Sequence, residues 1–384
     1  MLRFLLFPAL LLAALQAESF VSSKVCKQCH PLIYKEYAAS LHRNASIYND
    51  PVHKAVWDRH PAKAKERYGC AACHTPTDTK LTADLNAKKP AMPEPNRWEK
   101  EEAINCAYCH RIESIEKHTR FNTNRISPKA KTFFAAKNGK TTGEVLKFHR
   151  EKSFFGLSGG VTGSPFHTID YGNRNFVSGE TCMGCHDHKR NAKGFAVCDM
   201  EVKAGGKATC ISCHMPQVKG SFSTIVDSKT HAYHGFAGVY NAPQALAKTV
   251  RLSVEKNRDG FTAVIVNDAN HRLFAHPLRL GLLKATIGRD GREIALKPVA
   301  FYRVIGVDGK PSMPWLAEEV VRENAIGAFE RKAVFFDTPL QPGDRLTLTL
   351  GVYPVNPKAA KKLGLGGDKS ATEFVPFVTK HFDF

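Results

Sequence analysis

Cys26-Lys27-Gln28-Cys29-His30 is the first of five Cys-x-x-Cys-His stretches in this chain of 384 residues. The other four are Cys70–His74, Cys106–His110, Cys182–His186 and Cys210–His214. The spacing is typical of c-type haem attachment, because two thiols one helical turn apart can add to the two vinyl groups of one porphyrin. The following histidine then lies under the iron and supplies its proximal nitrogen. Five matches take up ten of the eleven cysteines, which makes chance or a set of zinc half-sites a poor explanation.

The motifs predict five covalently bound haem c groups, each held by two thioether bonds and one proximal histidine. The predicted attachment residues are Cys26, Cys29, Cys70, Cys73, Cys106, Cys109, Cys182, Cys185, Cys210 and Cys213. The predicted proximal ligands are His30, His74, His110, His186 and His214.

The N-terminus has the pattern of an export signal. Arg3 precedes the apolar stretch Phe4–Leu15, and Ala17 is a suitable last residue before cleavage. This pattern predicts a signal peptide over residues 1–17, and the stretch is short for the alternative, an uncleaved membrane anchor. We therefore expect a protein that does not span the membrane once processed. It would be periplasmic, secreted or on the cell surface, the side on which c-type haem is attached.

The chain is strongly basic, with 55 Lys and Arg against 36 Asp and Glu and a formal net charge of +19. Five haems would bring ten propionates, and part of the basic excess is expected to neutralise them. The remainder is consistent with solubility alone, with docking to an acidic redox partner, or with attraction of a small anion. Nucleic acid is not an expected partner of an exported haem protein.

The sequence pattern changes near residue 240. We expect a pentahaem cytochrome c domain over residues 18–240, built of short helices and irregular segments. After it the apolar residues alternate, as in Val250–Val254, and turn sequences recur at Asn257–Gly260, Asp290-Gly291 and Asp308-Gly309. Alternation with such turns predicts an antiparallel β-sandwich domain over residues 241–384.

Four segments carry more local expectations. Ile112–His118 and Pro314–Gly327 are expected to be short helices. Arg120–Gly163 is expected to be a mostly irregular insertion, and Lys358–Ser370, rich in lysine and glycine, a mobile loop.

Twelve histidines lie outside the motifs and could supply distal iron ligands. The residues after the first motif include Tyr34, Ser40 and His42, a pattern that resembles the cytochrome c-552/c-554 group of multihaem cytochromes. That resemblance implies His42 as a distal ligand. It also implies His167, at the end of Ser164–His167, and His231, with His234 as its substitute.

The second half of the chain resembles a β-domain that follows such haem domains. Asn267–His271 matches the Asn…Gly-His pattern of that domain, although Asn270 stands in place of glycine and the Pro-Thr-Gly piece is missing after His276-Pro277. The resemblance implies His271 as a ligand at the domain boundary. His118, eight residues after His110, is the remaining candidate for a neighbouring iron.

The other histidines have weaker support. His60 and His149 compete with His118, whereas surface or hydrogen-bonded core positions are expected for His53, His188, His276 and His381. Cys198, the odd cysteine, is expected to be a buried small side chain; the alternative is an iron or redox ligand near the fourth and fifth haems.

These features favour an electron carrier over an enzyme, and no catalytic residue is assigned. Mostly bis-histidine haems in a row would pass electrons between redox partner proteins, such as a membrane quinol oxidase or terminal reductase. The alternative is a haem-dependent oxidoreductase that acts on a small nitrogen or sulfur oxyanion at one five-coordinate haem. A third hypothesis is a subunit of a complex or of a self-assembled filament.

Overall fold

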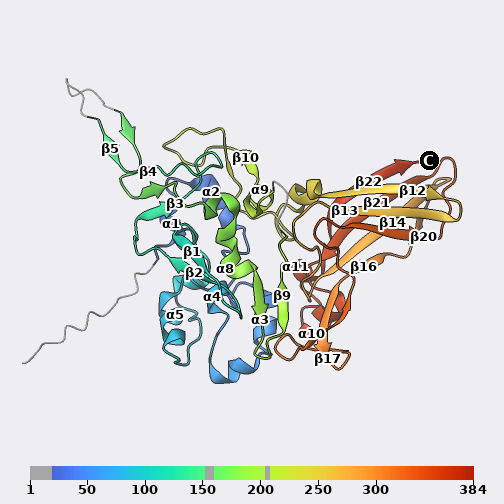
Figure 1. Cartoon of the computed structure of the whole chain (residues 1–384), viewed down its shortest axis with the longest axis horizontal. Coiled ribbons are helices and arrows are strands. Elements are labelled where there is room, and N and C mark those ends of the chain that lie inside the picture. Colours follow the sequence, from blue (N-terminus) through green and yellow to red (C-terminus); the bar gives the residue numbers. More distant parts are fainter. Residues whose placement is uncertain (1–19, 152–159, 204–207) are drawn as a thin grey trace, which may run out of the picture.

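The computed structural model describes residues 20–151, 160–203 and 208–384, so the predicted signal peptide lies outside the described residues. Figure 1 shows short helices and strands gathered in one half of the molecule and long strands in the other. We call these the haem-motif region (described residues 20–240) and the β region (residues 241–384). Among the described residues, no helix is both long and apolar enough to cross a membrane.

Each Cys-x-x-Cys-His motif lies on or beside a short helix, which brings its two cysteines to one side of a single turn. Local capping begins two of these helices: the Asn105 side chain accepts the backbone N–H of Tyr108, and Thr209 forms a reciprocal capping box with Ser212. The helices of this region are α1 (Ser23–Cys26), α2 (Pro31–Ala38), α3 (Pro51–Trp57), α4 (Ala71–His74), α5 (Thr79–Asn86), α6 (Cys106–Cys109), α7 (Asn175–Ser178), α8 (Met183–His186) and α9 (Cys210–His214), with 3₁₀ turns η1 (Pro61–Lys65), η2 (Trp98–Lys100) and η3 (Glu180–Cys182).

Short strands connect these helices. The expectation of a helix over Ile112–His118 is wrong, because Ile112–Glu116 forms strand β1 and pairs antiparallel with β2 (Thr123–Ile126). Segment 120–163 is likewise not irregular throughout, since it also contains β3 to β6. The remaining strands of the region are β3 (Thr132–Phe134), β4 (Val145–Leu146), β5 (His149–Arg150), β6 (Val161–Thr162), β7 (Thr168–Asp170), β8 (His188–Arg190), β9 (Ala196–Asp199), β10 (Gln217–Lys219) and β11 (Thr230–Ala232).

The hydrophobic clusters of the haem-motif region are small. One gathers around Trp57 and Tyr68, and another around Phe20 and Tyr108. Apolar side chains alone therefore supply little of what holds this region together.

The β region contains two antiparallel sheets that pack face to face, which confirms the predicted sandwich. One sheet has the order β12-β13-β20 and the other β15-β14-β21-β22, with β16 also pairing β14. Inward side chains of both sheets, such as Ile265 and Leu348, share one buried cluster. The strands are β12 (Val250–Asn257), β13 (Gly260–Asn267), β14 (Leu280–Arg289), β15 (Arg292–Ala295), β16 (Val299–Phe301), β20 (Arg331–Phe336), β21 (Arg345–Tyr353) and β22 (Val375–Asp383), preceded by the 3₁₀ turn η4 (Pro243–Thr249).

The turn sequences form hairpins as predicted. Asn257 pairs with Gly260 at the end of β12 and β13. Asp290 and Gly291 have φ values of 49° and 73°, and Asp308 and Gly309 have 49° and 70°. Two successive left-handed residues are what a two-residue hairpin turn requires.

Two expectations for the β region are corrected. Segment 314–327 contains strand β19 (Glu319–Glu323), which pairs with β17 (Arg303–Val307) beside β18 (Lys310–Pro311), because the pairing partner overrides the local preference for helix. Segment 358–370 is also ordered. Its first half lies within α10 (Pro357–Leu363), and its last two residues begin α11 (Lys369–Thr372).

The two regions contact each other through several elements. Ala360 and Leu363 of α10 are buried in one cluster with Ala55 of α3. Asn191 of the haem-motif region donates its side-chain N–H to the carbonyl oxygen of Ala317 at 2.7 Å. The backbone N–H of Lys203 donates to the Asn270 oxygen at 2.8 Å, which holds the loop that carries His271 against the haem-motif region.

Candidate functional site

In four places the histidine of a motif faces a second histidine from a distant part of the chain. The ring centres are roughly 6 Å apart in each pair, a separation that leaves room for one metal ion bonded to both rings with bonds of about 2 Å. The pairs are His30 with His167 at 6.3 Å, His186 with His42 at 5.9 Å, His110 with His234 at 6.2 Å, and His214 with His271 at 6.2 Å.

Backbone carbonyl groups orient the motif histidines. Nδ1 of His30 lies 2.6 Å from the Phe222 oxygen, and Nδ1 of His214 lies 2.6 Å from the Ala237 oxygen. Nδ1 of His110 makes the same contact with the Phe134 oxygen. A carbonyl can only accept, so Nδ1 carries the proton and Nε2 keeps the lone pair that a metal needs.

The facing histidines have related surroundings. Nδ1 of His234 donates to the Ala232 oxygen at 2.6 Å, and Nδ1 of His271 donates to the Arg272 oxygen at 2.9 Å. Nδ1 of His42 and Nδ1 of His167 are buried and have no hydrogen-bond partner within the described part of the chain. Burial lowers the pKa of His42 to about 3, which keeps that imidazole in the neutral, metal-binding form.

The second motif differs from the other four. His74 lies against His53 of α3 with ring centres 3.8 Å apart and planes 14° apart, so the two rings stack face to face. Nε2 of His53 is hydrogen-bonded to the Tyr68 hydroxyl at 2.7 Å. A metal ion bonded to both rings does not fit between faces this close. His53 could not be singled out from the sequence, because it belongs to no motif and no resemblance marks it.

The structure does not bring His231 up to a motif histidine. This buried side chain uses both nitrogens elsewhere: Nδ1 lies 2.9 Å from the Gly220 oxygen, and Nε2 lies 3.0 Å from Oε1 of Glu36. It therefore fastens β11 to α2, while His234, three residues later, faces His110. The resemblance implied His231 with His234 as its substitute, and it is His234 that the loop after β11 places opposite a motif histidine.

His118 also does not reach a motif histidine in the described residues. Its side chain is exposed, and Nε2 lies 3.2 Å from the Thr123 hydroxyl. Its competitors are placed differently again: His60 stacks on Trp57, and His149 is exposed on β5. Local pairing of β1 with β2 keeps His118 at the surface.

Thiol contacts bring the motifs next to one another. The Cys26 and Cys106 thiols lie close enough for Cys106 to lower the pKa of Cys26, which places the first motif beside the third. Asn124 joins the third and fourth motifs, because Nδ2 lies 2.9 Å from the Tyr108 hydroxyl and 3.7 Å from Sγ of Cys185. Two further thiol pairs involve the fourth motif: Cys73 with Cys185, and Cys182 with Cys210.

Cys198 lies on β9, opposite Lys189 of β8. Burial raises the pKa of its thiol, and the charges that act on it include those of Arg303 and Arg279. The Cys198 side chain is half-buried, so its position agrees only in part with the expected buried side chain.

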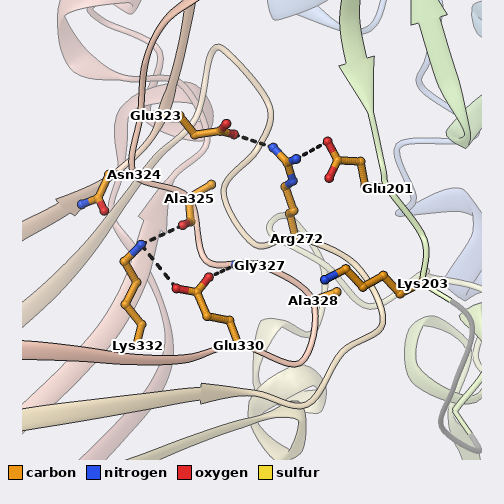
Figure 2. A pocket seen from close by; sticks show the side chains of 10 residues that line it. All are labelled: Glu201, Lys203, Arg272, Glu323, Asn324, Ala325, Gly327, Ala328, Glu330 and Lys332. Carbon is orange, nitrogen blue, oxygen red and sulfur yellow. Dashed lines mark hydrogen bonds and ion pairs between the residues drawn. The ribbon is translucent and has the colours of Figure 1, made fainter.

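A polar pocket of about 290 Å³ lies at the junction of the two regions, next to His271 in sequence. Figure 2 shows Arg272 between Glu201 and Glu323, with Lys332 and Glu330 on the opposite wall. The Arg272–Glu323 contact is 2.7 Å long, so the charges of this pocket largely compensate one another. Its lining is completed by Lys203, Asn324, Ala325, Gly327 and Ala328.

Comparison with known proteins supports this picture of the fold. Residues 25–111 match the family model described as cytochrome c554 and c-prime. Among solved structures, the chain is similar to the penta-haem cytochrome c552 from Thermochromatium tepidum. The TM-score is 0.67 and the identity 19%, over 95% of this chain and 99% of that chain. No curated protein matches. The chain thus contains a cytochrome c554-type domain and shares a fold with the c552 protein over both regions.

Proposed function

We propose that this chain is an exported pentahaem cytochrome c that carries electrons between redox partner proteins. The observation that carries the proposal is the set of four facing histidine pairs, each joining a motif histidine to a residue far away in sequence. Neutral imidazoles on both sides of an iron give six-coordinate, low-potential haem suited to electron transfer. The distal ligands proposed on this basis are His167, His42, His234 and His271.

The protein's own residues would fix how each haem is held. The ten motif cysteines form the thioethers, and the bound haem supplies one-electron exchange. Carbonyl groups such as those of Phe222, Phe134 and Ala237 hold the proximal rings in one tautomer and orientation. Burial lowers the pKa of His42, His110, His186 and His234, which favours their neutral, metal-binding form.

The thiol contacts support a connected path for electrons. Cysteines that touch bring the edges of the attached porphyrins together, so the first haem would adjoin the third and the fourth would adjoin the second, third and fifth. The predicted signal peptide supports export. The basic charge supports an acidic redox partner, and a membrane quinol oxidase or terminal reductase fits that description.

Haem counting and electron paramagnetic resonance (EPR) of the oxidised holoprotein test the proposal. We expect a mass that corresponds to the processed chain with five haems, and low-spin signals from at least four bis-histidine centres. Replacement of His42 by Met should convert one low-spin centre and raise its potential. A haem count below five, or His42→Met spectra identical to the unchanged protein, would contradict the assignment.

A second function is favoured by one observation, the geometry at the second motif. His53 stacks on His74 and is engaged by Tyr68, so the iron held by His74 would lack the histidine pair seen at the other motifs. An iron with an open face can bind an external ligand, which makes an oxidoreductase for a small nitrogen or sulfur oxyanion the alternative proposal. Lys189, close enough for its charge to act on His74, would attract such an anion.

EPR also separates this alternative from the pure carrier. A substantial high-spin ferric signal that responds to nitrite or hydroxylamine would support an open second haem. Tyr68→Phe, which removes the hydroxyl but keeps the ring, should then alter the ligand affinity while the low-spin signals stay unchanged. If only low-spin signals appear, His53 moves to ligate the iron and the carrier proposal alone remains.

A further inference from the structure

Two arginines at the junction of the regions lack a full complement of anionic partners. Arg303 begins β17 and is only 6% exposed. Its Nε and Nη1 atoms have no hydrogen-bond partner among the described residues. Nη2 donates to the Ala196 oxygen at 3.4 Å, and Oε1 of Glu323 lies 4.0 Å from Nε, at the limit of an ion pair.

Arg279, just before β14, is the second of these residues. Its guanidinium makes no ion pair or side-chain hydrogen bond with any described residue. Burial lowers its pKa, and the groups that act to raise it again are Tyr240 and Cys198. Burial raises the pKa of both of these groups, so they are neutral at ordinary pH. A guanidinium nevertheless keeps its proton in proteins.

Arg272 provides the contrast within the same junction. Figure 2 shows its guanidinium between Glu201 and Glu323, so two carboxylates serve one arginine. Glu323 is thereby already engaged at 2.7 Å, and the 4.0 Å approach to Arg303 is a weak second contact. Among the described residues, the buried Arg303 and the half-buried Arg279 therefore lack a close carboxylate partner, and a buried charge without compensation is strongly unfavourable.

The surroundings of these arginines indicate which anion is available. Nη2 of Arg303 donates to Ala196 on β9, and β9 pairs with β8, which begins two residues after His186 of the fourth motif. Cys198 lies on the same strand β9, and the charges of both arginines act on its thiol. Arg279 also acts on His186, the histidine of the fourth motif, and on His276. A haem attached at this motif carries two propionate carboxylates, and planar guanidinium groups bind carboxylates through paired hydrogen bonds.

We propose that Arg279 and Arg303 form a carboxylate-binding site for the propionates of the haem attached at Cys182 and Cys185. The inference rests on the proposed haem attachment and adds a role for the β region. Strands that carry no haem motif supply the counter-charge for a haem of the other region. A cation beside a haem favours the reduced iron, so the pair raises the potential of this haem and fastens the regions together.

The test is a redox titration of the holoprotein with Arg279→Gln and Arg303→Gln, followed by optical and EPR spectra. We expect one of the five transitions to move to lower potential. Its one-electron equilibrium should change by about tenfold, or 59 mV, while the other four stay in place. Arg331→Gln, which removes an exposed arginine paired with Glu255 on the sandwich, is the matched control and should move none.

A second variant and a second measurement complete the test. If Arg279→Gln does not accumulate, Arg279→Lys replaces it. This variant keeps the positive charge but cannot form the paired hydrogen bonds of a guanidinium with a carboxylate, so the propionate bending band in resonance Raman spectra should shift. Unchanged potentials and Raman bands in haem-loaded variants would overturn the proposal. A potential that depends on added inorganic phosphate would also overturn it, since the site would then take free anions. Absence of haem from the fourth motif by peptide mass would instead contradict the proposed function itself.

Discussion

The two regions of this protein are built on different principles. The β region shares one large buried cluster between two sheets, whereas the haem-motif region contains only small apolar clusters. What the haem-motif region has instead is a set of histidine pairs and touching thiols that come together from distant parts of the chain. The comparison teaches that one region can obtain its stability from its own side chains, while the other is arranged around groups that must be added to it.

The largest expected effect follows from withholding haem. A full chain produced without haem attachment should have a protease-sensitive haem-motif region and a protected β region, because small clusters do not offset the conformational entropy of some 200 residues. Limited proteolysis with mass analysis of the fragments measures this. The haem-loaded protein is the control and should resist digestion in both regions. Equal protection of both regions in the haem-free chain would abolish the contrast.

Within the β region, a cavity in the shared core should be costly. Leu348 is fully buried between the sheets, so Leu348→Ala should lower the free energy of unfolding by about 2–5 kcal/mol. Phe335→Ala is the control, since Phe335 is 56% exposed and its truncation should change stability by only about 0.5 kcal/mol. Chemical denaturation followed by circular dichroism gives both values. Similar losses for the two variants would show that the sandwich core is not the main support.

A smaller effect is expected at the turn that leads into β21. Asp344 is buried and accepts two hydrogen bonds from Arg289, at 2.8 and 2.7 Å, which lower its pKa. A carboxylate with a lowered folded-state pKa contributes stability above its unfolded pKa of about 3.9 and loses it as pH falls through the folded value. Asp344→Asn should therefore lower Tm by a few degrees at neutral pH, and the difference should shrink below about pH 4. A pH-independent difference would assign the effect to shape rather than charge.

The smallest effect on stability is expected for substitutions of His231 and His234. These two histidines should differ clearly in their effect on the EPR spectrum. His234→Met should change one low-spin EPR signal and raise one haem potential, because His234 faces His110. His231→Asn should leave the EPR spectrum unchanged while weakening the contact between β11 and Glu36. Spectral change in His231→Asn alone would restore the ligand role that its sequence context suggested.

The sequence allowed some of this to be predicted, and the reasons are physical. The haem-attachment motifs and the hairpin turns at Asp290 and Asp308 each consist of contiguous residues. Both could therefore be predicted from short stretches of sequence. Which histidine completes each pair depends on where loops bring residues that are 57 to 144 positions apart, as with His214 and His271 or His42 and His186. His53 has no local signal at all, and the strand at Ile112–Glu116 forms because a partner segment returns beside it.

The contacts of the fourth motif determine how the loss of a single haem would affect electron transfer through the others. In the proposed array this motif contacts three other motifs, whereas the contacts found in the described part of the chain join the first motif to the third alone, so the five sites branch rather than form a line. Loss of a haem at the first motif would shorten one arm and leave four connected centres. Loss of the haem at Cys182 and Cys185 would remove the centre at which the branches meet. The remaining haems would then form three groups without contact between them: the first with the third, the second alone and the fifth alone. Electron transfer through a branched array therefore depends most on the fourth haem. In our proposal this haem lies beside Arg279 and Arg303 of the β region.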